Sequence, residues 1–224
     1  MESFQLKFLK YVIDHRILRF GDFVLKSGRK SPYFFNAGLF DTGEKLSFLA
    51  DSYAEMVMYS DLQFDVIFGP AYKGIPLASA TASALARNHR IDKPFCFNRK
   101  EEKAHGEGWN LVGADLSGKV LITDDVITAG TAIREASEII KNNGAILSGV
   151  LLAMDRQEKS PSGLSTVQQI QEDFNVPVLS VITLEDIIKF LIAANDSDLQ
   201  KHLKNVQDYR EQYGAWDRNE VLTQ

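Results

Sequence analysis

The sequence predicts an α/β protein with a five-stranded, mostly parallel sheet covered by helices on both faces. Short apolar runs alternate with segments in which apolar residues recur every three or four positions. The apolar runs are nearly continuous, which is typical of strands buried on both faces of a parallel sheet. A chain of 224 residues, 45% of them hydrophobic, is long enough for one such core with a small additional subdomain.

The elements follow in order along the chain. The expected strands are 64–68, 94–97, 120–123, 149–153 and 178–182. Helical periodicity predicts helices over 3–14, 74–89 and 131–142, the last ending at Asn143-Gly144. N-cap signals place three more helices after Thr42, Ser165 and Thr183. A final helix carries the stripe Leu199, Leu203, Val206, Tyr209 and Tyr213.

Three parts of the chain are expected to differ in organisation. Residues 1–40 are expected to form a small N-terminal subdomain that lies over the main sheet, with a strand pair around Gly21-Asp22 and a basic loop after it. Residues 41–214 form the core. Within it, 98–117 lacks helical periodicity and is expected to be a mobile lid, because long loops inside compact domains are usually functional or disordered. Residues 215–224 are a tail.

Composition limits the classes of function. A formal net charge of −5 gives no reason to expect nucleic acid as a partner. Cys96, the single cysteine, lies between Phe95 and Phe97 and is expected to be a buried, inert thiol in a reducing compartment. The start of the chain does not resemble a signal peptide, and no apolar run is long enough to span a bilayer. We therefore expect a cytoplasmic protein without membrane contact.

One stretch, 120–132, combines the features of a ligand site. An apolar strand ends in Asp124 and Asp125, and Thr128-Ala129-Gly130-Thr131 then leads into a helix. Free backbone N–H groups at a helix N-terminus bind anions, whereas carboxylates accept hydrogen bonds from hydroxyls. The stretch therefore predicts a ligand that carries both a phosphate and a diol. The motifs of P-loop kinases, Rossmann dehydrogenases, zinc enzymes and serine hydrolases are absent.

Other segments are ambiguous when taken alone. The turn Gly69–Gly74 is either a tight βα connection or an anion loop with one lysine. The aromatic run Tyr33–Phe35 is more typical of a core than of a stacking surface. Arg156 follows a strand, where a solvated strand end is the simpler interpretation. Residues 98–113 contain Arg99, Lys100, Lys103 and His105 together with three acids, so this stretch is no plain basic patch.

Taken together, these segments resemble a known family. Residues 120–132 are similar to the phosphoribosyl pyrophosphate (PRPP) signature of type I phosphoribosyltransferases. The segments Lys26–Asn36, Gly69–Gly74, Asn98–Gly108 and Asp155–Glu158 resemble, in the same order, those of the orotate phosphoribosyltransferase family. The resemblance spans essentially the whole chain. One departure is Trp109, where the family pattern has a glycine.

The resemblance implies transfer of the phosphoribosyl group of PRPP to orotate. The products are orotidine 5′-monophosphate and pyrophosphate, in pyrimidine biosynthesis, and the cofactor is Mg²⁺. It implies the catalytic residues Lys103, His105, Asp124 and Asp125. It implies PRPP binding by Lys26, Tyr72, Lys73, Arg99, Lys100, Lys103, His105, Asp124, Asp125, Val126, Ile127, Thr128, Ala129, Gly130, Thr131 and Ala132. It implies orotate binding by Lys26, Phe34, Phe35, Thr128 and Arg156.

The resemblance also implies a homodimer in which Arg99, Lys103 and His105 serve the partner subunit's site. Mg²⁺ would be held mainly by PRPP, with Asp124 and Asp125 nearby and no direct protein ligand. Two alternatives remain open at this point. A purine or uracil phosphoribosyltransferase would share the acidic loop but would have no use for a carboxylate-binding Arg156. A regulator that senses PRPP would have little use for Lys103 and His105 in a lid.

Overall fold

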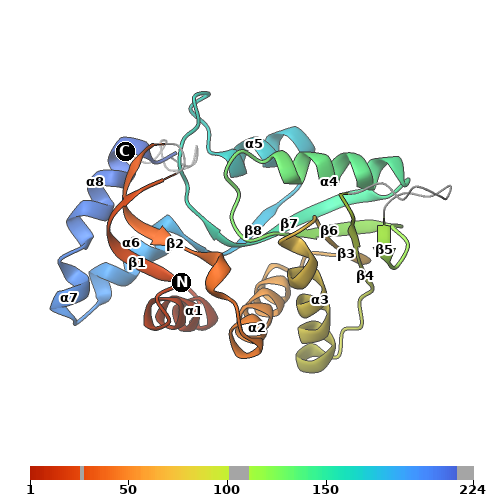
Figure 1. Cartoon of the computed structure of the whole chain (residues 1–224), viewed down its shortest axis with the longest axis horizontal. Helices are drawn as coiled ribbons and strands as arrows, with labels where there is room; N and C mark the ends of the chain where they lie inside the picture. Colours follow the sequence, from red (N-terminus) through yellow and green to blue (C-terminus); the bar gives the residue numbers. More distant parts are fainter. Residues whose placement is uncertain (26–27, 101–110, 216–224) are drawn as a thin grey trace.

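The computed structural model describes residues 1–25, 28–100 and 111–215. Within these ranges a six-stranded sheet lies between two layers of helices, and a two-stranded hairpin lies at one end (Figure 1). The strands are β1 (Leu18–Val24), β2 (Lys30–Phe35), β3 (Val66–Gly69), β4 (Phe95–Asn98), β5 (Leu111–Gly113), β6 (Lys119–Thr123), β7 (Ile146–Asp155) and β8 (Val178–Thr183). The helices are α1 (Ser3–Asp14), α2 (Gly43–Ser60), α3 (Gly74–Ala84), α4 (Thr131–Asn142), α5 (Thr166–Phe174), α6 (Leu184–Ala193), α7 (Ser197–Gln200) and α8 (Leu203–Tyr213), with short helical segments at Ala37–Leu39 and Leu85–His89.

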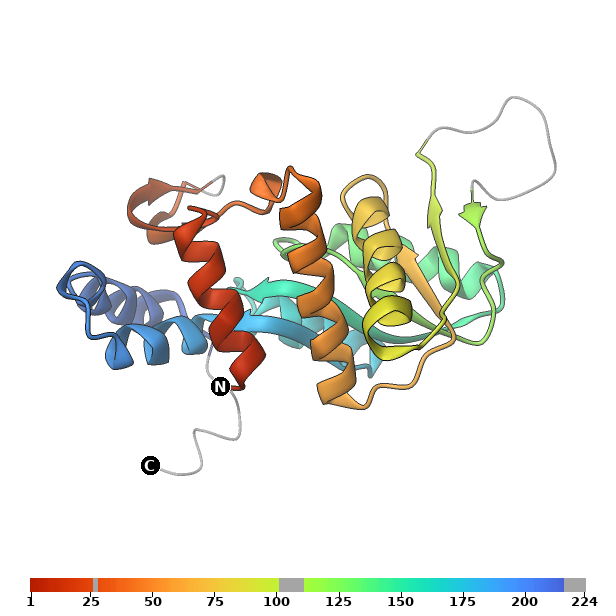
Figure 2. The ribbon, with the colours of Figure 1, turned by 90° about the horizontal axis from the view of Figure 1, so that it is seen from below.

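The central strands are buried on both faces, as their apolar composition predicts. In β6, Val120 and Ile122 pack in the core under α4 and α5, whereas Leu121 packs in the core under α1, α2 and α3. Adjacent residues of a strand point to opposite faces, so each apolar run supplies both cores. Figures 1 and 2 show the two helical layers on either side of the sheet. The predicted fold class is confirmed.

The number of strands differs from the prediction of five. The sixth strand, β5, lies at the edge and pairs antiparallel with β4, Cys96 opposite Gly113. It falls inside 98–117, which the sequence analysis treats as a single loop. A strand of three residues, paired on one side only and ending in glycine, has too little alternation to be recognised by periodicity.

The expected strand pair around Gly21-Asp22 is also wrong. A single strand, β1, runs through both residues and pairs antiparallel with β2. The register shifts between Phe20 and Phe23, so the glycine and aspartate form a bulge and not a turn. The chain reverses later, where Leu25 N donates to Arg29 O at 2.8 Å.

Each of the three predicted capping signals marks the start of a helix. The Thr42 hydroxyl accepts from Lys45 N at the start of α2, and Ser165 and Thr183 form capping boxes with Gln168 and Asp186. The expected last helix is instead two helices, α7 and α8, separated at Lys201-His202. In the described ranges no helix is long and apolar enough to cross a membrane.

The order of the strands creates one position where the chain reverses direction across the sheet. From β3 the chain moves to β4, whereas from β6, the other neighbour of β3, it moves to β7 and β8. The connections therefore leave β3 and β6 in opposite directions. A crevice forms at the carboxyl ends of two such strands, and open α/β sheets bind ligands there.

Candidate active site

The reversal between β3 and β6 brings together two of the predicted segments. The turn after β3 carries Lys73, and the loop after β6 begins with Asp124 and Asp125. The Lys73 ammonium donates to Asp125 Oδ2 at 2.6 Å, and the two residues are 52 positions apart in the sequence. The Asp125 side chain is 9% exposed and that of Lys73 is 72% exposed. Lys73 is therefore an exposed cation beside a buried carboxylate.

The acidic pair is held by the main chain of the sheet. Asp124 N donates to Leu151 O at 3.0 Å, and Ala153 N donates to Asp125 O at 2.9 Å, so both residues extend the pairing of β6 with β7. From the opposite layer, the Tyr53 hydroxyl donates to Asp124 O at 2.7 Å. Burial, and then the charge of Asp125, raise the pKa of Asp124 to about 6. An incoming group that donates hydrogen bonds or carries positive charge would relieve this repulsion.

The loop after the acidic pair presents backbone donors. Within the described residues, the amides from Ile127 to Thr131 donate no hydrogen bond to another protein group. They surround a hollow of about 120 Å³ lined by Asp124 and residues 126–133, at the N-terminus of α4. Gly130 adopts φ +75°, a left-handed conformation that suits glycine. This arrangement can bind a phosphate group.

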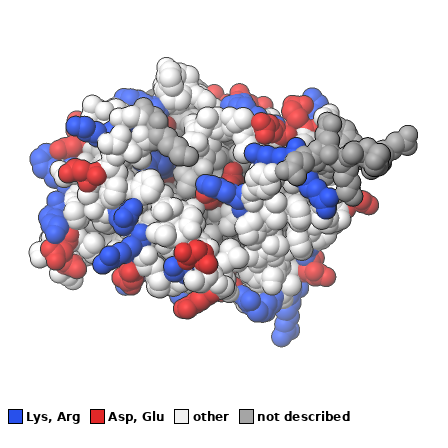
Figure 3. All heavy atoms as spheres, in the orientation of Figure 1, with Lys and Arg blue, Asp and Glu red and all other residues white. Residues whose placement is uncertain are grey.

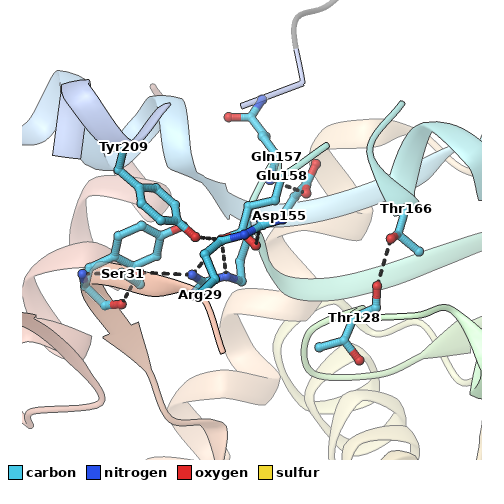
Figure 4. A network of polar contacts seen from close by, with 10 residues as sticks. Arg29, Ser31, Thr128, Asp155, Gln157, Glu158, Thr166 and Tyr209 are labelled. Atoms are coloured by element: carbon cyan, nitrogen blue, oxygen red, sulfur yellow. Dashed lines mark hydrogen bonds and ion pairs between the residues drawn. The ribbon is translucent and has the colours of Figure 1, made fainter. Parts of the chain in front are cut away.

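The loop is braced by α5. The Thr166 hydroxyl donates to Thr128 O at 2.7 Å (Figure 4). A β-carbon on Gly130 would lie 3.1 Å from Thr166 Cγ2 and 3.3 Å from Ile170 Cδ1. The predicted phosphate residues, Val126 to Ala132, therefore form one loop whose shape depends on close contact with α5.

The turn after β3 forms the opposite wall. A β-carbon on Gly69 would lie 2.2 Å from Gly74 O, so the turn requires glycine at this position. Ala71 N donates to Asn98 Oδ1 at 2.8 Å, and the Ala71–Tyr72 peptide bond is cis. Lys100 Nζ lies 5.4 Å from the Tyr72 ring centre. A hollow of about 230 Å³ lies between this turn and α4, lined by residues that include Pro70, Ala71, Asn98, Lys100, Thr131 and Ala132.

Arg156 directly follows β7, the neighbour of β6. Its guanidinium donates from Nε and Nη2 to Glu158 Oε1, at 2.8 and 2.6 Å, and from Nη2 to Ser31 Oγ at 3.2 Å. It lies 4.4 Å from the centre of the Tyr33 ring. Figure 4 shows this cluster at the junction of β2, β7 and α8. Glu158 also accepts from Arg29 and from the Tyr209 hydroxyl.

The structure separates the two predicted orotate-binding phenylalanines. Phe35 is buried in the core and packs near Phe40, whereas Phe34 lies on the opposite face of β2, half-buried beside Phe23. Because neighbouring residues of a strand face opposite ways, one planar ligand cannot stack on both rings. Arg99 is exposed just after β4. Lys26, Lys103, His105 and Trp109 lie outside the described residues.

No group of three or more His, Cys, Asp or Glu side chains in the described ranges is arranged to hold a metal ion. On the face shown in Figure 3, Lys and Arg side chains alternate with Asp and Glu side chains and form no broad field of one sign. Cys96 is buried, as predicted, and burial raises its thiol pKa to about 12, which keeps the thiol protonated and unreactive.

Sequence reasoning missed several residues that support the site. Tyr53 lies in the helix predicted after Thr42, and Asn98 begins a segment that resembles the family, but neither is predicted as a site residue. Glu158 stands in a recognised motif, but nothing in the sequence indicates that Arg29, 129 positions earlier, binds it. Tyr53 and Asn98 each carry a polar atom, a hydroxyl or an amide oxygen, next to apolar or strand positions. These polar atoms are the signals that could have indicated the contacts.

Comparison with known proteins agrees with this geometry. Residues 46–182 match the model of the phosphoribosyl transferase domain. The chain is 58% identical to an orotate phosphoribosyltransferase of Pseudomonas paraeruginosa, across 96% of this chain and all of that protein. It is 54% identical to one from Escherichia coli, with the same shares of each chain covered. A crystal structure of the Francisella tularensis enzyme has a TM-score of 0.84 at 44% identity, covering 93% of this chain and 99% of that one. The chain belongs to the orotate phosphoribosyltransferase family of type I phosphoribosyltransferases.

Proposed function

We propose that this protein transfers the phosphoribosyl group of PRPP to orotate, which yields orotidine 5′-monophosphate and pyrophosphate. The reaction belongs to pyrimidine biosynthesis. Identity of 54–58% to members of the family, across 96% of this chain, is the single observation that carries this proposal. The phosphate-sized loop beside an acidic pair, at the reversal of the sheet, supplies matching chemistry.

The bond between the ribose C1 and pyrophosphate breaks as positive charge develops on the sugar. Asp124 and Asp125 accept hydrogen bonds from the ribose hydroxyls and stabilise that charge. The amides of residues 127–131 bind the 5′-phosphate, and Lys73 leaves Asp125 to meet the pyrophosphate. No covalent intermediate is needed, so catalysis depends on positioning and on preorganised charge.

Orotate is held from the other side. Arg156 binds its carboxylate, because a planar guanidinium pairs with a carboxylate through two hydrogen bonds. Lys26, Thr128 and Phe34 complete the base site, with Phe34 offering the ring face that Phe35 does not. Residues 1–40 cover this end of the site, and residues 41–214 form the core that carries it, ahead of the tail at 215–224.

Magnesium fits the site as a partner of the substrate. Burial, and then the charge of Asp125, raise the pKa of Asp124, so a nearby cation would be favoured at this pair. Mg²⁺ held by PRPP oxygens would supply that charge and would stabilise the leaving pyrophosphate. Asp124 and Asp125 would lie near such a cation. The protein acts in the cytoplasm, where a single buried cysteine stays reduced.

Within 98–117, the segment between β4 and β5 is the lid of a shared site in a twofold dimer. Arg99, Lys103 and His105 serve the partner subunit, while Lys100 stays with its own, and Lys103 stabilises the departing pyrophosphate. A mixture of Lys103→Ala and Asp125→Asn chains tests this. Heterodimers place both defects in one site and restore the other, so the mixture should regain activity that neither variant has. No recovery would contradict a lid that crosses between subunits.

The reaction itself is tested by the loss of orotate absorbance on addition of PRPP and Mg²⁺. Turnover of uracil or hypoxanthine in place of orotate would make the proposed function wrong. Arg156→Lys tests the carboxylate contact, because lysine keeps the charge and loses the planar pair of donors. We expect the KM for orotate to rise about tenfold, with the KM for PRPP little changed. Equal rises in both constants would contradict the assignment of Arg156.

A further inference from the structure

We infer that Glu158 is a positioning residue for Arg156, and that helix α8 belongs to the substrate site because it holds Glu158. The inference rests on the proposed function, since it takes the orotate carboxylate as the ligand of Arg156. Glu158 would fix the guanidinium in the one orientation that leaves donors free for that carboxylate.

The contacts of Arg156 occupy one edge of its guanidinium. Nε and Nη2 form that edge, and both donate to Glu158 Oε1. The Tyr33 ring, 4.4 Å away, fixes the plane of the group. Among the described residues Nη1 has no hydrogen-bond partner, and the Nη2 contact to Ser31 is long at 3.2 Å. The Nη1/Nη2 end therefore remains available to a second carboxylate.

Besides Arg156, Glu158 accepts hydrogen bonds from two donors in distant parts of the chain. Oε2 accepts from Arg29 at 3.0 Å, and Oε1 accepts from the Tyr209 hydroxyl at 2.6 Å (Figure 4). The three charged side chains are only 12–25% exposed. Without Glu158, two guanidiniums would lie close together without an anion between them, and their repulsion would move Arg156 from its place over Tyr33.

Helix α8 and the residues after it contact both the Glu158 carboxylate and the main chain of residues 157–159. Tyr209 lies on α8, and at the end of the helix Tyr213 O accepts from Lys159 N at 2.8 Å. Ala215 N donates to Gln157 O at 2.7 Å, so the chain after α8 pairs with the segment that contains Glu158. The Arg29 guanidinium lies 4.6 Å from the Tyr213 ring centre. A helix near the C-terminus thus determines the orientation of a residue that follows β7.

This arrangement affects one substrate and not the other. The cluster contacts none of the loop at 124–131 in the described residues, so loss of Glu158 should weaken orotate and leave PRPP unchanged. A role in packing alone would not separate the two substrates. It would also not separate orotate from uracil, which has the same ring and lacks the carboxylate.

The test compares Glu158→Gln and Tyr209→Phe with the matched control Glu211→Gln, which makes the same change on the exposed side of α8. Glutamine keeps the shape and one acceptor oxygen but removes the charge. We expect the KM for orotate to rise about tenfold in Glu158→Gln and about threefold in Tyr209→Phe, with the KM for PRPP and inhibition by uracil within twofold of wild type. The control should match wild type in all three.

Two results would overturn the inference: an unchanged KM for orotate in both variants, or a parallel rise in the constants for orotate, PRPP and uracil. If Glu158→Gln does not fold, Tyr209→Phe decides alone, because it removes one hydroxyl and keeps the ring. Wild-type enzyme without turnover of orotate would refute the proposed function itself. Wild-type turnover with no selective loss in the variants would refute only the role of Glu158.

Discussion

Gly130 offers a sharp test of the phosphate loop, because the same helix carries its own control. Gly130 precedes α4 and Gly144 follows it, and both adopt φ +75°. A β-carbon on Gly144 would meet nothing within 4 Å, whereas one on Gly130 would lie 3.1 Å from Thr166 Cγ2 and 3.3 Å from Ile170 Cδ1. Substitution of each by alanine thus has the same backbone cost and a different steric cost.

The left-handed conformation costs an alanine about 1–2 kcal/mol at either position. At Gly130 the crowded contacts add about 1–3 kcal/mol of the kind seen when a packed region is overfilled. We therefore expect Gly130→Ala to lower the free energy of unfolding by roughly 2–5 kcal/mol and Gly144→Ala by roughly 1–2 kcal/mol. Urea unfolding followed by circular dichroism measures both values.

Activity adds an independent readout. If α5 moves away from the new methyl group, the bond from Thr166 to Thr128 O lengthens and the loop amides shift. The KM for PRPP should then rise about tenfold in Gly130→Ala and stay at the wild-type value in Gly144→Ala. Equal losses of stability in the two variants, or an unchanged KM for PRPP in Gly130→Ala, would refute the reasoning that contact with α5 shapes the loop.

Two further predictions concern charged residues of the site. Lys73→Met should raise the KM for PRPP about tenfold with little loss of stability, because the lysine is mostly exposed. The control Lys45→Met, at an exposed pair with Asp41, should change neither the KM nor the stability. Michaelis constants and Tm check this, and a large drop in Tm for Lys73→Met would contradict it. The second concerns Asp155, whose pKa is raised to about 6 by burial and then by the charge of Glu158. Because the folded-state pKa lies above the usual 3.8, stability from this group is full below about pH 4 and is lost as the pH rises through about 6. Asp155→Asn should therefore raise Tm at pH 8 and have little effect on Tm at pH 4. An increase in Tm that is the same at both pH values would show that Asp155 does not cause the loss of stability at high pH.

Local signals in the sequence predicted the helix starts and the main strands well. Capping residues such as Thr42 and Ser165 act within three positions. An apolar run such as 120–123 can be recognised as a strand from its own residues, without knowledge of the strands that pair with it. The edge strand β5 escaped because three residues paired on one side leave almost no pattern. The bulge at Gly21-Asp22 escaped because glycine next to aspartate also suits a turn, and only pairing with β2 decides between them.

The candidate site also contains residues that the sequence predicts and residues that it does not. Asp124, Asp125 and the loop after them follow from the order strand, acids, glycine and helix, which is contiguous in the sequence. The partners of these residues are not contiguous. Tyr53 reaches Asp124 across 71 positions and Arg29 reaches Glu158 across 129, and such pairings depend on how the layers pack. No periodicity within a segment carries that information.

The last hydrogen bond between β6 and β7, from Ala153 N to Asp125 O, has a consequence for redesign of the enzyme. Up to that bond the main chain pairs with β7 and is part of the sheet. Beyond it, residues 126–129 form no main-chain hydrogen bond with β7. Of these four, Thr128 and Ala129 are exposed, whereas Val126 and Ile127 pack against the two cores. Mutational libraries limited to Thr128 and Ala129 would explore new anionic ligands with little penalty in expression. Libraries that include Asp124 and Asp125 would select for folding and for binding at once, and the two effects could not be told apart.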